Sequence, residues 1–258
     1  MNVMMENIYA VKSNNELIEY QNFVKQIQPR LIEYIDYLNS EYAVSELPKS
    51  IVWTSYDIAT KLISNIPIPA YTNDFRVVIT PSIDAWRRIY LAQLSSIEKG
   101  KSYEELQKYY NSQISTNHIL QILGHELAHH IPFFMDEEDK SLDSGIWFEE
   151  GMVEYISRRY FLTANEFSGA HENNLILVNA LRSKYGKHSL DEFGAATYEG
   201  DLASIFFEYW RSYLAVHAIV DDHNGDIHKV FASYQDWYSR RNDISLLEWF
   251  AVEEMTFL

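Results

Sequence analysis

The positions of proline constrain the fold of this chain more than any other feature. All six prolines lie within the first 132 of the 258 residues. Because proline interrupts helices, the second half of the chain has room for long, unbroken helices. We therefore expect an N-terminal part that is divided into short elements and a C-terminal part that is almost entirely helical.

The spacing of apolar residues predicts the individual elements. Residues 14–45 carry apolar side chains three and four positions apart, which predicts one or two amphipathic helices. The runs SIVWTS (50–55) and RVVITP (76–81) are rich in β-branched residues and predict a small sheet, whereas residues 83–97 fit either a helix or a strand. Further helices are expected at about 102–111, 115–131, 146–160, 173–185, 200–222, 226–240 and 244–257. The expected fold class is α+β, predominantly helical.

Charge and composition exclude several classes of partner. The chain has 21 basic and 37 acidic residues, a formal net charge of −16, and we expect neither nucleic acid nor a membrane surface as a partner. No cysteine is present, which excludes disulfides, thiolate catalysis and cysteine metal sites. The sequence has no signal-peptide pattern and no apolar run of transmembrane length. A cytoplasmic location is therefore the default expectation, and a mature secreted form would look the same.

The segment GHELAHH (124–130) predicts a metal site. On a helix, His125 and His129 lie one above the other, so that both imidazoles can reach one ion about 2 Å away. Glu126 is rotated by one position and places its carboxylate where a bound water would lie. This is the HExxH arrangement of zinc enzymes, in which the glutamate is the general base. His130 points about 100° away from His129 around the helix axis and is expected to flank the site.

A catalytic zinc ion typically takes three protein ligands, and the segment IWFEEGMVEYISRRY (146–160) offers the third. Glu150 and Glu154 are four residues apart and share one helix face. Gly151 costs a helix about 1 kcal/mol relative to alanine. Its presence beside Glu150 predicts that another backbone approaches closely at this point.

These residues resemble the gluzincin metallopeptidases, in which a glutamate on a second helix completes an HExxH zinc site. The segment 147–151 is similar to the W-x-x-E-G signature of their aminopeptidase branch. The resemblance implies that Glu150 is the third ligand and that Glu154 holds the ring of the first zinc histidine. Glu149 is expected at the surface, with the ligand role as its alternative. Metzincins need glycine and histidine where this chain has Pro132 and Met135, and peptide deformylases need a cysteine.

The segment 206–225 resembles the gluzincin helix that supplies a tyrosine to stabilise the oxyanion. Tyr209, followed by Ser212, matches that position, and Tyr213 is its alternative. His217 and His223 are further candidates for the same role, although a structural or solvent-exposed position fits each of them better. Arg211 can recognise a substrate carboxylate, although an ordinary salt bridge is the better interpretation.

The resemblance also implies an architecture and an activity. The expected domain has two lobes, residues 1–114 with helices and the small sheet and residues 115–258 with the zinc-binding helices, and an active-site cleft between them. The sheet edge in 50–81 is expected to bind an extended peptide by strand addition. One Zn²⁺ per chain and a peptide or protein substrate follow, and endopeptidase activity is favoured over exopeptidase activity. The G-x-M-E-N motif of exopeptidases and an Asn-Ala edge motif are absent from the sequence.

Two alternatives to a zinc peptidase stay open at the level of sequence. The chain can be a catalytically inactive gluzincin-like protein with a binding or regulatory role, although the intact ligands and base argue against it. It can also be a zinc hydrolase that acts on a non-peptide bond. The sequence identifies neither the natural substrate nor the oligomeric state.

Overall fold

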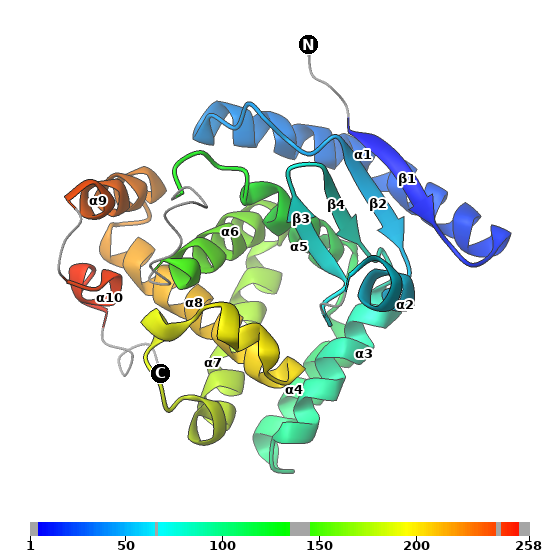
Figure 1. Ribbon diagram of the computed structural model, residues 1–258. Helices are drawn as coiled ribbons and strands as arrows, with labels where there is room; N and C mark the ends of the chain where they lie inside the picture. Colours follow the sequence, from blue (N-terminus) through cyan, green and yellow to red (C-terminus); the bar gives the residue numbers. More distant parts are fainter. Residues whose placement is uncertain (1–4, 65–66, 135–144, 241–243, 253–258) are drawn as a thin grey trace. The chain divides into compact units, whose positions relative to one another are not determined.

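The computed structural model has the predominantly helical α+β fold that the sequence predicts (Figure 1). It describes residues 5–64, 67–134, 145–240 and 244–252. The strands are β1 (Glu6–Ala10), β2 (Ser50–Thr54), β3 (Ala70–Asn73) and β4 (Arg76–Ile79). The α-helices are α1 (Asn14–Tyr42), α2 (Tyr56–Ile58), α3 (Ile83–Gln93), α4 (Lys101–Ser112), α5 (Thr116–Ala128), α6 (Ile146–Phe161), α7 (Ala164–Tyr185), α8 (Leu202–Asp222), α9 (Ile227–Arg240) and α10 (Leu246–Trp249). In the described ranges, no helix has both the length and the apolar character of a membrane span.

The chain forms two compact units, each assembled from several segments. The first unit comprises residues 1–90, 113–132 and 156–162, and the second comprises residues 91–112, 133–155 and 163–258. The expected two-lobed arrangement, with a division between residues 114 and 115 and a cleft between the lobes, stays a prediction.

The first unit is built on a mixed four-stranded sheet with the order β1-β2-β4-β3. β1 and β4 pair with β2 in parallel, and β3 pairs antiparallel with β4 as an edge strand. Every residue of β2 is buried, because both faces of the sheet are covered. Val52 and Val78 pack against Ala59 of the short π-helix η1 (Ala59–Ile63), while the ring of Trp53 meets Phe23 of α1 edge to face. The alternation of side chains along a strand therefore links this sheet to a helix on each face.

Several elements differ from the sequence-based expectation. Residues 14–42 form one continuous helix with Pro29 inside it, and residues 83–93 are helical. β1 and β3 were not predicted, because short strands with mixed polarity are stabilised by their pairing partners rather than by an apolar pattern. α7 begins nine residues earlier than expected, where Thr163 and Glu166 form a capping box. Of the expected helix 244–257, residues 246–249 are helical and residues 253–257 lie outside the described residues.

The second unit has an aromatic core around the start of α6. The ring of Phe148 stacks on Tyr234 of α9, with ring centroids 4.3 Å apart, and on Phe250 at 5.6 Å. The indole N–H of Trp147 donates to the carboxylate of Asp191 at 2.9 Å. The side chains of Trp147 and Phe148 are both fully buried. The Trp-Phe pair of the W-x-x-E-G segment therefore fixes the N-terminal end of α6 in its unit.

α6 and α8 cross at Gly151. A β-carbon built on Gly151 would collide with the backbone carbonyl of Ser212 and would lie 2.5 Å from the side chain of Val216. Only glycine allows the two backbones to come this close. The sequence-based prediction that another backbone approaches Gly151 is confirmed.

The Gly151→Ala variant should therefore be destabilised. The gain in helix propensity is about 1 kcal/mol, but the clash is with backbone atoms, which cannot rotate away, and overpacking of this kind costs about 1–3 kcal/mol or more. We expect a net decrease in the free energy of unfolding, measured by urea denaturation. The matched control is Gly169→Ala in α7, where the nearest atom to the new β-carbon, on Tyr109, is 3.4 Å away. Equal stability of the two variants would contradict the proposed packing.

Candidate metal centre

α5 holds His125 and His129 in a tightly packed helix. The side chain of Ser115 caps its first turn, and every residue from His118 to Ala128 is buried. Tyr34 of α1 donates a hydrogen bond from its hydroxyl to the carbonyl oxygen of Gly124 at 3.0 Å. A β-carbon at Gly124 would lie 2.6 Å from the ring of Phe161. The residue before His125 is thus fixed by a backbone hydrogen bond and by close ring packing.

The Nε2 atoms of His125 and His129 lie at a distance that suits a single ion. Their Nε2 atoms are 3.3 Å apart, and their ring centroids are 5.0 Å apart. Two nitrogen ligands of a tetrahedral zinc ion, each at about 2.0–2.1 Å from the metal, lie about 3.3–3.4 Å apart. The separation of His125 and His129 therefore matches one edge of a zinc coordination tetrahedron.

Contacts within the first unit set the register of α6 on α5. The guanidinium of Arg30 donates to the side chain of Asn117 at 2.7 Å and to the carbonyl oxygen of Phe161 at 3.2 Å, so the start of α5 lies beside the end of α6. One turn further along α5, the amide of Gln121 donates to the hydroxyl of Ser157 at 3.3 Å. From the first pair to the second, the residue number rises along α5 and falls along α6, as in antiparallel packing.

The predicted ligands continue the same faces of the two helices. His125 and His129 follow Gln121 by one and two helical turns of α5, and Glu150 precedes Ser157 by two turns of α6.

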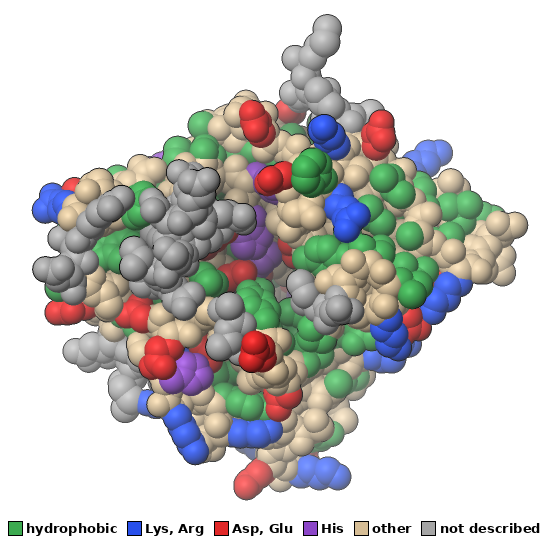
Figure 2. All heavy atoms as spheres, viewed as in Figure 1, with side chains coloured by type: hydrophobic (Ala, Val, Ile, Leu, Met, Phe, Trp, Pro, Cys, Tyr) green, Lys and Arg blue, Asp and Glu red, His purple; other side chains and the backbone are tan. Residues whose placement is uncertain are grey.

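His125, His129 and Glu150 form a group that can hold a metal ion. One ligand atom of each residue lies within 4.8 Å of the ligand atoms of the other two. His125 is 7% and Glu150 8% exposed, and His129 is partly exposed. Two imidazoles and one carboxylate are a donor set of catalytic zinc sites, in which the fourth position is left for water. Figure 2 shows histidine side chains (purple) that reach the surface on the face in view.

The other predicted residues of α5 and α6 differ in burial and in partners. Glu126 is 7% exposed and thus as buried as His125 and Glu150. His130 is hydrogen bonded through Nε2 to the hydroxyl of Thr72 in β3 at 2.9 Å, which joins the end of α5 to the edge strand of the sheet. Glu149 and Glu154 are partly buried. The predicted role of Glu154 toward the ring of His125 stays a prediction.

Two tyrosines lie at the carboxylate of Glu150. The hydroxyl of Tyr209 in α8 donates to Oε1 of Glu150 at 3.2 Å. The hydroxyl of Tyr198, in the 3₁₀ turn η5 (Ala195–Glu199), lies 3.4 Å from the same oxygen, and the two phenol oxygens are 3.0 Å apart. Tyr213, the alternative to Tyr209, is fully buried and packs against the rings of Phe167 and His171. The contacts therefore favour Tyr209 over Tyr213.

Tyr198 was not found by sequence reasoning. The chain has 19 tyrosines, and Tyr198 lies in a short turn outside any motif. The sequence contains only indirect signals for its position. Ser189 and Asp201 are the N-caps of η4 (Leu190–Glu192) and α8, and they fix the two ends of the turn region that carries Tyr198.

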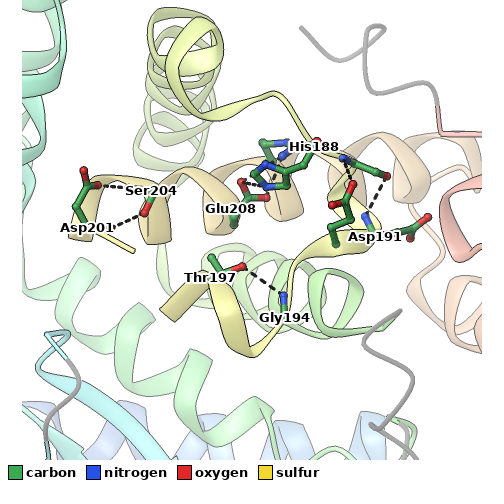
Figure 3. A network of polar contacts seen from close by, with 10 residues as sticks. His188, Asp191, Gly194, Thr197, Asp201, Ser204 and Glu208 are labelled. Atoms are coloured by element: carbon green, nitrogen blue, oxygen red, sulfur yellow. Dashed lines mark hydrogen bonds and ion pairs between the residues drawn. The ribbon is translucent and has the colours of Figure 1, made fainter. Parts of the chain in front are cut away.

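The remaining candidates of α8 have structural partners. Arg211 forms a buried ion pair with Glu208 at 3.0 Å, as the salt-bridge interpretation predicted, and Glu208 also bonds His188 at 3.1 Å (Figure 3). Burial raises the pKa of Glu208, and the nearby charges of Arg211 and His188 partly oppose that rise. His217 pairs with Asp221 at 3.3 Å, and His223 ends α8 with Nδ1 2.7 Å from the carbonyl oxygen of Ile219.

Comparisons with known proteins do not add a family or an activity to this geometry. No protein-family model matches the chain, and neither curated proteins nor solved structures gave a match. The resemblance to the gluzincins therefore rests on the motif residues themselves.

Replacing Arg211 by methionine should destabilise the protein. The change leaves the carboxylate of Glu208 buried without its guanidinium partner, which costs about 3–5 kcal/mol of unfolding free energy at neutral pH. Loss of the guanidinium raises the pKa of Glu208 further. The folded state then holds the proton of Glu208 more tightly than the unfolded state. The loss of stability therefore shrinks as the pH falls toward 4.5, the ordinary pKa of a glutamate.

Chemical denaturation between pH 4 and pH 8 measures this effect. The control is the double variant Glu208→Leu/Arg211→Met, in which no buried charge remains, and it should be more stable than Arg211→Met at neutral pH. An Arg211→Met protein as stable as the wild type, but weakened in substrate binding, would instead support the carboxylate-recognition alternative.

Proposed function

We propose that this protein is a zinc-dependent peptidase of the gluzincin type, with one Zn²⁺ per chain held by His125, His129 and Glu150. The observation that carries the proposal is the group formed by these three side chains, with two imidazole nitrogens 3.3 Å apart and a nearby buried carboxylate. The types of ligand and their burial fit zinc better than magnesium or calcium, which prefer oxygen ligands. The W-x-x-E-G resemblance supports the same choice of third ligand.

The buried base Glu126 carries the proton transfers in this proposal. When zinc is bound, it lowers the pKa of a coordinated water toward about 7 and polarises a carbonyl group. The carboxylate of Glu126, one residue from the ligand His125, accepts the proton of the attacking water and passes it to the leaving amine. The burial of Glu126 keeps bulk water away from this proton.

The phenol of Tyr209 supplies the hydrogen-bond donor to the developing oxyanion. Its hydroxyl lies 3.2 Å from the carboxylate of the proposed ligand Glu150 and is therefore next to the proposed metal position. A donor that is already held near the reacting carbonyl stabilises negative charge without a reorganisation step.

A peptide substrate is supported by the position of β3. This strand forms an edge of the sheet, and its Thr72 is bonded to His130, which directly follows the proposed ligand His129. An extended peptide can add to such an edge through main-chain hydrogen bonds and bring a peptide carbonyl toward the end of α5. Endopeptidase activity is favoured, since the exopeptidase motif is absent from the sequence.

Zinc binding tests the ligand assignment. The wild type should bind one zinc per chain, and Glu150→Ala should weaken that binding at least tenfold because one of three protein ligands is lost. The measurement is competition with a zinc chelator of known affinity. Glu149→Ala, at the neighbouring position of the same helix, is the matched control and should keep the wild-type affinity. An unchanged zinc affinity of Glu150→Ala would refute the assignment.

Cleavage of a peptide library tests the reaction. Glu126→Gln keeps the shape of the side chain, but the amide cannot accept a proton. We expect kcat to fall about 10²–10⁴-fold while zinc binding persists. The control is Glu149→Gln, which should cleave like the wild type. Undiminished cleavage by Glu126→Gln would contradict the mechanism. A wild type that binds zinc but hydrolyses no peptide would favour the non-catalytic or the non-peptide alternative.

A further inference from the structure

Tyr198 is placed at the proposed site by an extended network of contacts. The segment that carries it, residues 188–201, is tied to α8 at its start, where His188 bonds the buried carboxylate of Glu208 and where Arg211 donates to the carbonyl oxygen of His188 at 3.1 Å (Figure 3). At its end, Asp201 accepts hydrogen bonds from the backbone N–H of Ser204 and from the hydroxyl of Tyr185. Both ends of the segment are thus held by the same unit that holds Tyr209.

The two tyrosine rings rest on one buried side chain. The ring of Phe193, which is fully buried, lies 6.0 Å from the ring of Tyr198 and 5.7 Å from that of Tyr209, measured between centroids. Because Phe193 packs against both rings, their relative position is set by packing and does not depend on the phenol contact alone. The two hydroxyls meet at 3.0 Å as a result.

The distances indicate how two phenol protons are shared among three oxygens. Each phenol has one proton to donate and can also accept. Tyr209 is 3.2 Å from Glu150, Tyr198 is 3.4 Å from it, and the phenols are 3.0 Å from each other. The arrangement that uses the two shorter distances has Tyr198 donating to Tyr209 and Tyr209 donating to Glu150. A phenol that accepts a hydrogen bond becomes a stronger donor itself.

We infer that Tyr198 is a positioning residue of the reaction, which holds and polarises the phenol of Tyr209 so that, when a peptide substrate is bound, Tyr209 turns its proton from Glu150 to the carbonyl oxygen of the substrate. This inference rests on the proposed function. Tyr198 acts through Tyr209 and contacts neither the substrate nor the metal. Its removal therefore affects the chemical step and leaves the affinity for zinc unchanged.

The test compares Tyr198→Phe, Tyr209→Phe and the double variant in the zinc-loaded protein. Tyr198→Phe should lower kcat about tenfold, the factor that one hydrogen bond is worth, with KM little changed. Tyr209→Phe should lower kcat about 10²–10³-fold. Because Tyr198 acts through Tyr209, the double variant should be no slower than Tyr209→Phe alone.

A second measurement and a matched control separate positioning from loosening of the segment. Tyr198→Phe should keep its zinc dissociation constant within about twofold of the wild type, since a single weak contact to Glu150 is lost. Tyr185→Phe removes a hydroxyl that binds Asp201 at the end of the same segment, 3.0 Å from Oδ1, and it does not contact Glu150 or Tyr209. Because the backbone N–H of Ser204 still holds Asp201 in this variant, the control should keep the wild-type kcat.

The outcomes distinguish the inference from the proposed function. A double variant slower than Tyr209→Phe by the full factor of Tyr198→Phe would overturn the inference. So would a wild-type kcat of Tyr198→Phe, or a decrease in kcat of Tyr185→Phe equal to that of Tyr198→Phe. So would a tenfold weaker binding of zinc by Tyr198→Phe, since it would mean that Tyr198 acts on Glu150. A wild type without zinc-dependent peptide cleavage would overturn the proposed function together with the inference. Failure of the proposed function is therefore read from the wild type, and failure of the inference alone is read from the variants.

Discussion

The close contact between the backbones of α6 and α8 at Gly151 is the constraint on which the candidate site depends. Glu150 directly precedes Gly151, and Tyr209 lies one turn before Ser212, whose carbonyl oxygen occupies the space of the missing β-carbon. The contact therefore fixes the distance from Glu150, the proposed third ligand, to the phenol of Tyr209. A bulkier residue at position 151 would push the helices apart. It would change the geometry of the site although every proposed ligand is kept.

The same principle operates on α5, where Gly124 precedes His125. The rings of Tyr34 and Phe161 occupy the space beside Gly124, and the hydroxyl of Tyr34 bonds its carbonyl oxygen. Each glycine thus stands beside a polar side chain that must be held in a buried place. Burial of imidazole and carboxylate groups is unfavourable unless they are partnered, and the carboxylate of Glu150 accepts a hydrogen bond from Tyr209 in its buried place.

The sequence was sufficient to predict the helical half of the fold and the residues that come together at α5 and α6. The HExxH spacing and the Glu150-Gly151 pair follow from helix periodicity, which is a local property. Strand β1 was missed because pairing with distant residues, such as Ile8 with Val52, stabilises it. Strand β3 was missed because its four residues have mixed polarity and pair with β4 in a hairpin, as Tyr71 does with Val78. Tyr198 was missed for a similar reason. Its position depends on how a turn region folds back on α8, and no periodic pattern records that.

The polar network of α8 links the stability of this unit to its chemistry. Glu208 and Tyr209 are neighbours in the chain, yet Glu208 is buried beside Arg211 and His188, while Tyr209 faces Glu150. Adjacent helix residues differ by about 100° in direction, so one turn of α8 holds the segment of Tyr198 on one side and presents a phenol to the proposed metal ligand on the other. The buried charge of Glu208 is costly unless it stays paired, and pairing requires that His188 and its segment remain against α8. The pairing of Glu208 therefore acts together with the packing of Phe193 against both rings to keep Tyr198 within hydrogen-bonding distance of Tyr209.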